Sequence, residues 1–254
     1  MKTPVSILGI IPLTLLFSTF AWSATELRST DGFKNPESAL FDETRNIIYV
    51  SNVDGEPTNK DGAGHISLLT TGGQLHDLTW VTGLNAPKGL VQHGNLLFVS
   101  DIDQLVSIDV DSGKVAGTWD AEGAKFLNDL AVDDSGQVYV SDMLTSSIYR
   151  LSGDTLSLWL QDEALQHPNG LQVDNNRLLV APWGKDLQDD FSTKVPGHLI
   201  AVDLASKSIS TVGSGEPVGN LDGLESDGEG NWLVTDWMAG ALYRIDSRWL
   251  SENE

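Results

Sequence analysis

The stretch FLNDLAVDDSGQVYVSD, residues 126–142, contains the pattern that decides the fold. An apolar segment opens with Leu127-Asn128-Asp129-Leu130, a turn rich in Asp, Ser and Gly follows, and a second apolar segment ends at Ser141-Asp142. Two apolar segments joined by such a turn are typical of a β-hairpin. The same pattern begins five times in the chain, at Pro36, Pro87, Leu127, Pro168 and Leu221.

These hairpins recur at a regular spacing. Equivalent positions in successive units are 51, 40, 41 and 53 residues apart, counted between Glu37, Lys88, Asn128, Asn169 and Asp222. Repeats of about 40–50 residues are typical of propeller blades. Further strands follow each hairpin, and the sequence has no convincing long amphipathic helix. We therefore predict an all-β fold, a β-propeller of four-stranded antiparallel blades.

The fifth unit is shorter than the others. It reaches a third strand at 241–245, and residues 247–250 are only a stub of a fourth. About five blades are therefore expected, either as a closed five-bladed ring or as a six-bladed design without its last blade. An array that does not close exposes sheet faces and edges.

The first residues have the features of an export signal. Met1-Lys2 precede an apolar run from Val5 to Trp22, and small residues flank Trp22 at Ala21 and Ser23. This pattern predicts a cleaved secretory signal peptide over 1–23 and a propeller domain over 24–254. The alternative is an uncleaved membrane anchor, because the run is nearly long enough to span a bilayer. We expect export, to the periplasm or into the medium, with no stable membrane insertion after cleavage.

Composition excludes several classes of function. Acidic residues outnumber basic residues by 36 to 15, which argues against nucleic acid or anionic membranes as partners. The chain has no cysteine, so Cys/His catalysis is excluded and no disulfide stabilises the exported protein. No Gly-x-Ser-x-Gly elbow or phosphate-binding loop is present.

Four of the five equivalent positions carry an oxygen donor. Residues at the same place in successive blades converge on the propeller axis, so Glu37, Asn128, Asn169 and Asp222 are expected to meet there. Two carboxylates and two amide oxygens are hard donors that suit Ca²⁺ better than zinc or copper, and another divalent cation is the alternative. Taken singly, each of these residues is also compatible with an ordinary turn or strand start.

Four further residues are candidates near this ring. Lys88 occupies the same place in the second blade, where it either faces an anionic intermediate or neutralises acids such as Asp101. Asp129 follows Asn128 and is either a support for the ring or a general base. His167 lies two residues before Asn169, and Trp183 opens a long loop that is expected to wall the channel mouth.

Three segments, at 126–143, 168–174 and 221–236, resemble the senescence marker protein / gluconolactonase family. Its wider superfamily includes paraoxonase, diisopropyl fluorophosphatase and strictosidine synthase-like proteins. The resemblance implies a six-bladed propeller that binds a divalent cation, usually calcium, in its channel and hydrolyses lactones or organophosphate esters. The family's ligand positions match Glu37, Asn128, Asn169 and Asp222, whereas its sixth blade has no counterpart here.

From the residues and the resemblance together we predict a metal-dependent hydrolase that acts on a small-molecule lactone or related ester. Asp222 is the first choice for the base that activates water, and Asp129 is the second. The alternative is a non-catalytic, calcium-stabilised propeller that binds a ligand or partner at the channel rim. A third interpretation is a carbohydrate-binding surface at Trp183 and Trp237. The sequence leaves the substrate and the oligomeric state open.

Overall fold

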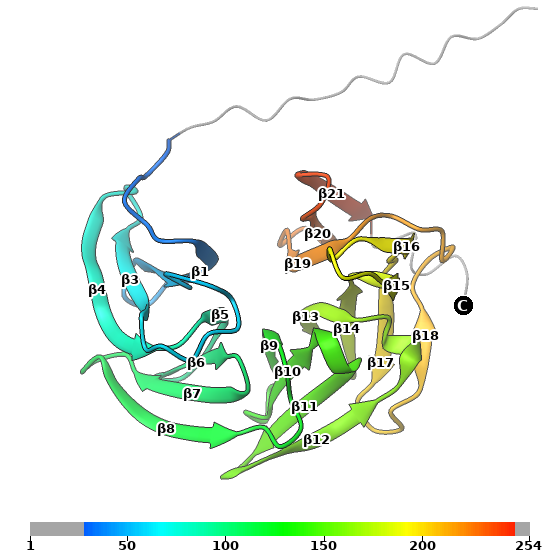
Figure 1. Cartoon of the computed structure of the whole chain (residues 1–254), viewed down its shortest axis with the longest axis horizontal. Coiled ribbons are helices and arrows are strands. Elements are labelled where there is room, and N and C mark those ends of the chain that lie inside the picture. The colour runs from blue at the N-terminus through cyan, green and yellow to red at the C-terminus, as the bar shows by residue number, and fades with distance from the viewer. Residues whose placement is uncertain (1–27, 247–254) are drawn as a thin grey trace, which may run out of the picture.

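A computed structural model describes residues 28–246 of the chain (Figure 1). The predicted signal peptide and the stub at 247–250 lie outside these residues. The described part is a β-propeller, as predicted, with two single-turn 3₁₀ helices at Met143–Thr145 and Glu163–Leu165.

Each of the first four blades contains four antiparallel strands. Blade 1 is β1 (Pro36–Asp42), β2 (Ile47–Asn52), β3 (Gly64–Thr70) and β4 (Leu75–Leu84). Blade 2 is β5 (Pro87–His93), β6 (Leu96–Asp101), β7 (Gln104–Asp109) and β8 (Lys114–Asp120). Blade 3 is β9 (Leu127–Val132), β10 (Val138–Asp142), β11 (Ser147–Ser152) and β12 (Thr155–Gln161). Blade 4 is β13 (Pro168–Asp174), β14 (Arg177–Pro182), β17 (Ile200–Asp203) and β18 (Ile209–Thr211).

Blade 5 has three strands within the described residues: β19 (Leu221–Ser226), β20 (Asn231–Asp236) and β21 (Ala241–Asp246). Between the second and third strands of blade 4 the chain forms a separate hairpin of β15 (Gly184–Leu187) and β16 (Thr193–Pro196). This hairpin is the long loop that the sequence placed at the channel mouth.

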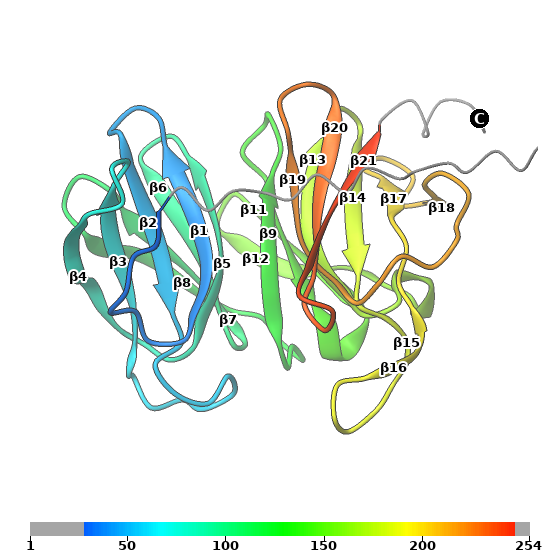
Figure 2. The same ribbon diagram turned by 90° about the horizontal axis from the view of Figure 1, so that it is seen from above.

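The blades are arranged around a central axis, with the first strand of each blade innermost (Figure 1). Neighbouring first strands contact one another in the order β1, β5, β9, β13 and β19. No comparable contact joins β19 to β1 among residues 28–246, and the arrangement is open between blades 1 and 5. Figure 2 shows these two blades standing apart, with β9 visible between them.

Tight turns join the first two strands of the blades. In blade 3, Asp133 Oδ1 accepts hydrogen bonds from the backbone N–H groups of Ser135 and Gln137, at 2.9 and 3.0 Å. In blade 5, Asp227 Oδ1 accepts the equivalent bonds from the N–H groups of Glu229 and Asn231. The carboxylate thus satisfies the backbone donors that the turn leaves unpaired, which is consistent with Asp at this place in four of the five blades.

The core lies between the blades rather than within one of them. Because side chains alternate across a strand, each of blades 2 to 4 presents one apolar face to the preceding blade and another to the following blade. Four buried clusters fill the interfaces between successive blades. The faces on either side of the open sector instead expose apolar side chains, and Phe41 and Leu242 are 49% and 64% exposed.

Candidate functional site

The five equivalent positions of the repeat lie around one cavity of about 470 Å³. Each is the second residue of its blade's first strand, and together they are Glu37, Lys88, Asn128, Asn169 and Asp222. The structure therefore brings together all of the residues predicted to form the ring. Asp129 and His167 are not among the residues that line this cavity.

Hydroxyl groups from the second strands hold the inner strands in place. The Ser141 hydroxyl donates to the backbone carbonyl of Asn169 in the next blade, at 2.7 Å. The Ser100 hydroxyl donates in the same way to the carbonyl of Asn128. Both serines are fully buried, so these bonds form where water does not compete. They fix the backbone of two ring residues relative to the preceding blade.

Glycine follows three of the five equivalent residues, and two of these glycines, Gly89 and Gly170, allow neighbouring blades to approach closely. A Cβ atom at Gly89 would lie 2.6 Å from the carbonyl oxygen of Asn128. A Cβ atom at Gly170 would clash with the carbonyl oxygen of Asp222. The Asn-Gly dipeptide at 169–170 therefore serves blade packing at a strand start, and not a hairpin turn.

Asn169 and Asp222 are joined directly. The side-chain nitrogen of Asn169 donates to Asp222 Oδ1 at 2.7 Å. This bond uses the nitrogen of the amide and not its oxygen. Burial raises the pKa of Asp222, and the bond from Asn169 partly opposes that rise.

Loss of contact with bulk water, together with neighbouring carboxylates, raises the pKa of Glu37. The pKa of Glu37 rises to about 8, first because the surrounding blades displace bulk water and then because Asp222 and Asp129 repel its charge. Lys88 partly offsets this rise. By accessible surface Glu37 is an exposed residue, and it lines the cavity from blade 1. The ring is thus a place where a cation would relieve repulsion between acids.

Asp129 ties two blades together. Its Oδ1 accepts the backbone N–H of Leu130 and its Oδ2 accepts that of Leu171 in blade 4, both at 2.8 Å. Burial raises the pKa of Asp129 to about 7, against the effect of these two bonds. Because both carboxylate oxygens accept backbone amides, the geometry favours the supporting role over that of a general base.

Lys88 is buried and anchored on two backbone carbonyls. Its Nζ donates to Pro57 O and Ala86 O at 3.0 and 3.1 Å and lies 4.5 Å from the centre of the Phe126 ring. Burial lowers the pKa of Lys88 to about 8, although Glu37 and Asp101 act in the opposite direction. These contacts fix the lysine beneath the loop that follows β2, with its charged end at the cavity.

Aspartates at the ends of the second strands cap the loops around the mouth. Asp101 accepts the backbone N–H groups of Asn85 and Ala86, at 2.9 and 2.7 Å. Asp142 accepts those of Lys125 and Phe126, and also that of Leu144. These bonds fix the loops that precede β5 and β9, and Phe126 lines the cavity from the second of these loops.

Apolar side chains form one wall of the cavity, named here the aromatic wall. Its members are Phe126, Met143, Trp183, Phe191 and Trp237. The rings of Trp183 and Trp237 lie 5.8 Å apart between centroids, and those of Phe126 and Phe191 lie 6.4 Å apart. Trp183 was predicted from the sequence. Phe126 and Met143 were missed, although each flanks a repeat motif and could have been found from that position.

His167, expected on the substrate side of the ring, lies instead in a separate hollow with Glu163, Gln166 and Lys185. Its Nδ1 is 2.8 Å from the backbone carbonyl of Met143. Both Gln166 and His167 have left-handed backbone conformations, with φ of 56° and 60°. This local bend turns the chain just before β13, so proximity in sequence to Asn169 does not bring the imidazole to the ring.

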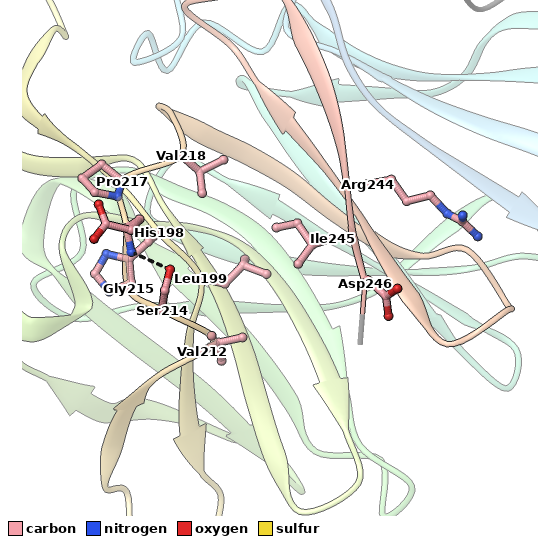
Figure 3. A pocket seen from close by; sticks show the side chains of 12 residues that line it. His198, Leu199, Val212, Ser214, Gly215, Pro217, Val218, Arg244, Ile245 and Asp246 are labelled. Atoms are coloured by element: carbon pink, nitrogen blue, oxygen red, sulfur yellow. Dashed lines mark hydrogen bonds between the residues drawn. The ribbon is translucent and has the colours of Figure 1, made fainter. Parts of the chain in front are cut away.

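Another pocket lies between the loop at 212–218 and the end of β21 (Figure 3). Val212, Val218 and Ile245 contribute much of its apolar lining. None of the five equivalent repeat positions borders it. The cavity on the axis is therefore the stronger candidate site.

Within 28–246, no three His, Cys, Asp or Glu side chains are grouped so as to hold a metal ion. A cation at the ring would thus depend on the two carboxylates together with the two amides.

In the same part of the chain, no helix is long and apolar enough to cross a membrane.

Comparisons with known proteins show the fold. No protein-family model matches the chain, and no curated protein matches it. A chain in the crystal structure of the nidogen/laminin complex is similar, with a TM-score of 0.66 and 18% identity over 87% of this chain and 78% of that chain. A catalytically inactive virginiamycin B lyase from Staphylococcus aureus, with quinupristin, has a TM-score of 0.57 and 12% identity over 88% of both chains.

A computationally designed protein, Ika8, is a third structural neighbour. Its TM-score is 0.54 and its identity 16%, over 87% of this chain and 61% of that chain. At such low identities these likenesses show the propeller architecture alone. The resemblance to the gluconolactonase family remains a prediction from the motifs.

Proposed function

We propose that the protein is a metal-dependent hydrolase that acts on lactones or related esters at the axial cavity. The observation that carries this proposal is the ring itself. Oxygen donors from four different blades, two of them carboxylates, line one cavity beside an apolar wall. A pocket with a few convergent polar groups and apolar walls is the usual form of a small-molecule site.

The ring residues are of the donor types that a calcium ion prefers. Glu37, Asn128, Asn169 and Asp222 offer only hard oxygen donors, which Ca²⁺ prefers, and two negative charges to balance it. Another divalent cation that accepts oxygen ligands is the alternative. When bound, such an ion supplies Lewis-acid polarisation of the ester carbonyl and stabilises the negative charge that develops on its oxygen.

The protein's own groups supply the rest of the chemistry. Asp222 is the proposed general base, because it borders the cavity and burial raises its pKa above the ordinary value of an aspartate. Its carboxylate takes a proton from water as the water oxygen bonds to the carbonyl carbon. The ester C–O bond then breaks, and the leaving oxygen takes up the proton to give a hydroxy acid.

Turnover of simple lactones with calcium, and with a chelator in its place, tests this proposal. Hydrolysis is expected only with the metal, and Asp222→Asn is expected to lower kcat by roughly 100-fold or more, as loss of a general base does. Glu43→Gln, at an exposed carboxylate on the turn after β1, is the matched control and should leave turnover unchanged. Full activity of Asp222→Asn with calcium still bound would exclude Asp222 as the base.

A second candidate function is a calcium-stabilised propeller that binds a partner at the rim without catalysis. Trp237 and Met238, beside the cavity mouth, are 65% and 46% exposed, and large exposed apolar groups often mark interaction sites. This alternative predicts that calcium stabilises the fold while no lactone is hydrolysed. The predicted export to the periplasm or the medium is part of either proposal.

A further inference from the structure

The axial cavity has two chemically different sides. Its polar side is the ring of first-strand residues with Lys88, whereas the aromatic wall is built from blade 3, the chain around the β15–β16 hairpin and blade 5. A molecule that fills the cavity therefore meets polar groups at one end and aromatic faces at the other.

The aromatic wall has a fixed base and an accessible face. Trp183 and Phe126 are only 5% and 8% exposed and pack with Met143 in one buried cluster. Phe191 and Trp237, which contact these two rings, are 39% and 65% exposed. The two buried rings thus hold the two accessible rings at the mouth of the cavity.

Several polar groups near the aromatic wall are bonded within the protein. The indole N–H of Trp183 donates to the carbonyl of Phe191 at 2.7 Å. Asp190 Oδ1 accepts both the N–H and the hydroxyl of Ser192. Asn220 donates to the Trp183 carbonyl and to the Thr193 hydroxyl. A ligand rich in hydroxyl groups would lose bonds to water here and gain few in return.

We infer that the substrate is a lactone with a flat apolar substituent, such as an aryl ring, and not a polyhydroxylated sugar lactone. This inference rests on the proposed hydrolase function and specifies its substrate. The lactone carbonyl lies at the polar ring, and the substituent packs against Phe191 and Trp237. A cavity of about 470 Å³ has room for both parts.

Three probes separate the contributions of the two sides: γ-phenyl-γ-butyrolactone, unsubstituted γ-butyrolactone and glucono-δ-lactone. With the full chain and calcium, kcat/KM for the phenyl lactone is expected to exceed that for each of the others by about ten-fold or more, the scale of aromatic and apolar contacts. The uncatalysed rate of each lactone is subtracted.

Trp237→Ala tests the contact directly, because this exposed side chain contributes little to the core. It is expected to lower kcat/KM for the phenyl lactone by roughly five- to ten-fold, mainly through KM, and to leave γ-butyrolactone unchanged. Phe191→Ala should act in the same direction. Leu242→Ala, which removes an exposed side chain that does not line the cavity, is the matched control and should change neither value.

Two results would overturn the inference while the hydrolase proposal stands. One is calcium-dependent hydrolysis of glucono-δ-lactone at least as efficient as that of the phenyl lactone. The other is an equal loss for both butyrolactones in Trp237→Ala. If no lactone is hydrolysed with calcium present, the hydrolase proposal fails and the inference fails with it.

Discussion

Blades 3 and 5 contain nearly the same third strand in different surroundings. The strands read SIYRLS in β11 and ALYRID in β21. Ile148 and Leu242 hold the same register, opposite Ser141 and Thr235 of their second strands. Ile148 is fully buried against blade 4, whereas Leu242 is 64% exposed beside the open sector. The presence of a neighbouring blade, and not the strand's own sequence, therefore decides whether the side chain at this position is buried.

The hydroxyl groups opposite these two residues differ in the same way. The Ser141 hydroxyl donates to the carbonyl of Asn169 in the next blade. Thr235 Oγ1 accepts the N–H of Gly223 within its own blade. Blade 3, which has a neighbour on each side, therefore shares apolar and polar contacts with the next blade at these positions. In blade 5 the equivalent residues face the open sector or bond within their own blade.

The largest expected difference in stability between blades 3 and 5 comes from truncating the equivalent apolar residues of their third strands. Ile148→Ala removes a fully buried side chain and should lower the free energy of unfolding by about 2–5 kcal/mol. Leu242→Ala should change it by no more than about 0.5 kcal/mol. Urea unfolding of both variants checks this. Equal losses would mean that another chain covers the open face in solution.

A smaller difference is expected for the two hydroxyls. Ser141→Ala leaves the Asn169 carbonyl and the Asp129 N–H without their buried partner, so about 1–3 kcal/mol of stability should be lost. Because the bond positions Asn169, calcium affinity should fall as well, measured by calorimetry. Thr235→Ala is the matched control, and calcium affinity that is equally reduced in it would argue against positioning by Ser141.

The smallest expected difference in stability is between variants of two arginines. Arg45 joins blades 1 and 2 through Asp42 and Asp111, whereas Arg244 bonds Asp227 and Glu229 within blade 5. Arg45→Gln should cost at most about 1 kcal/mol, because the guanidinium is partly exposed. Arg244→Gln should cost less. Unfolding of both variants in urea at pH 7 compares the two sites.

The Arg45 effect should depend on pH. Burial alone would raise the pKa of Asp42, but hydrogen bonds from the Arg45 N–H and guanidinium lower it overall. A lowered carboxylate pKa contributes stability above its unfolded value of about 3.9, and that contribution is lost as pH falls through the folded value. The difference between wild type and Arg45→Gln should therefore shrink at acidic pH. A constant difference would contradict the assignment to Asp42.

The sequence predicts the fold and the ring because both follow from periodicity. A fixed spacing places Glu37, Asn128, Asn169 and Asp222 at the same point of successive blades, so they meet without any knowledge of loop conformation. The position of His167 could not be predicted in this way, because left-handed backbone at 166–167 turns the chain. The anchoring of Lys88 likewise depends on the Pro57 carbonyl, which a long loop brings to it.

Calcium-dependent thermal unfolding tests the central claim, that four blades hold one cation, most directly. An ion that binds only the folded chain should add about 2.7 kcal/mol at 100 times its Kd, which raises Tm by several degrees. This rise is expected in the wild type and in Glu43→Gln, and it should be lost with chelator and absent in Asn169→Ala. A Tm that calcium leaves unchanged in the wild type, or raises equally in Asn169→Ala, would contradict the claim.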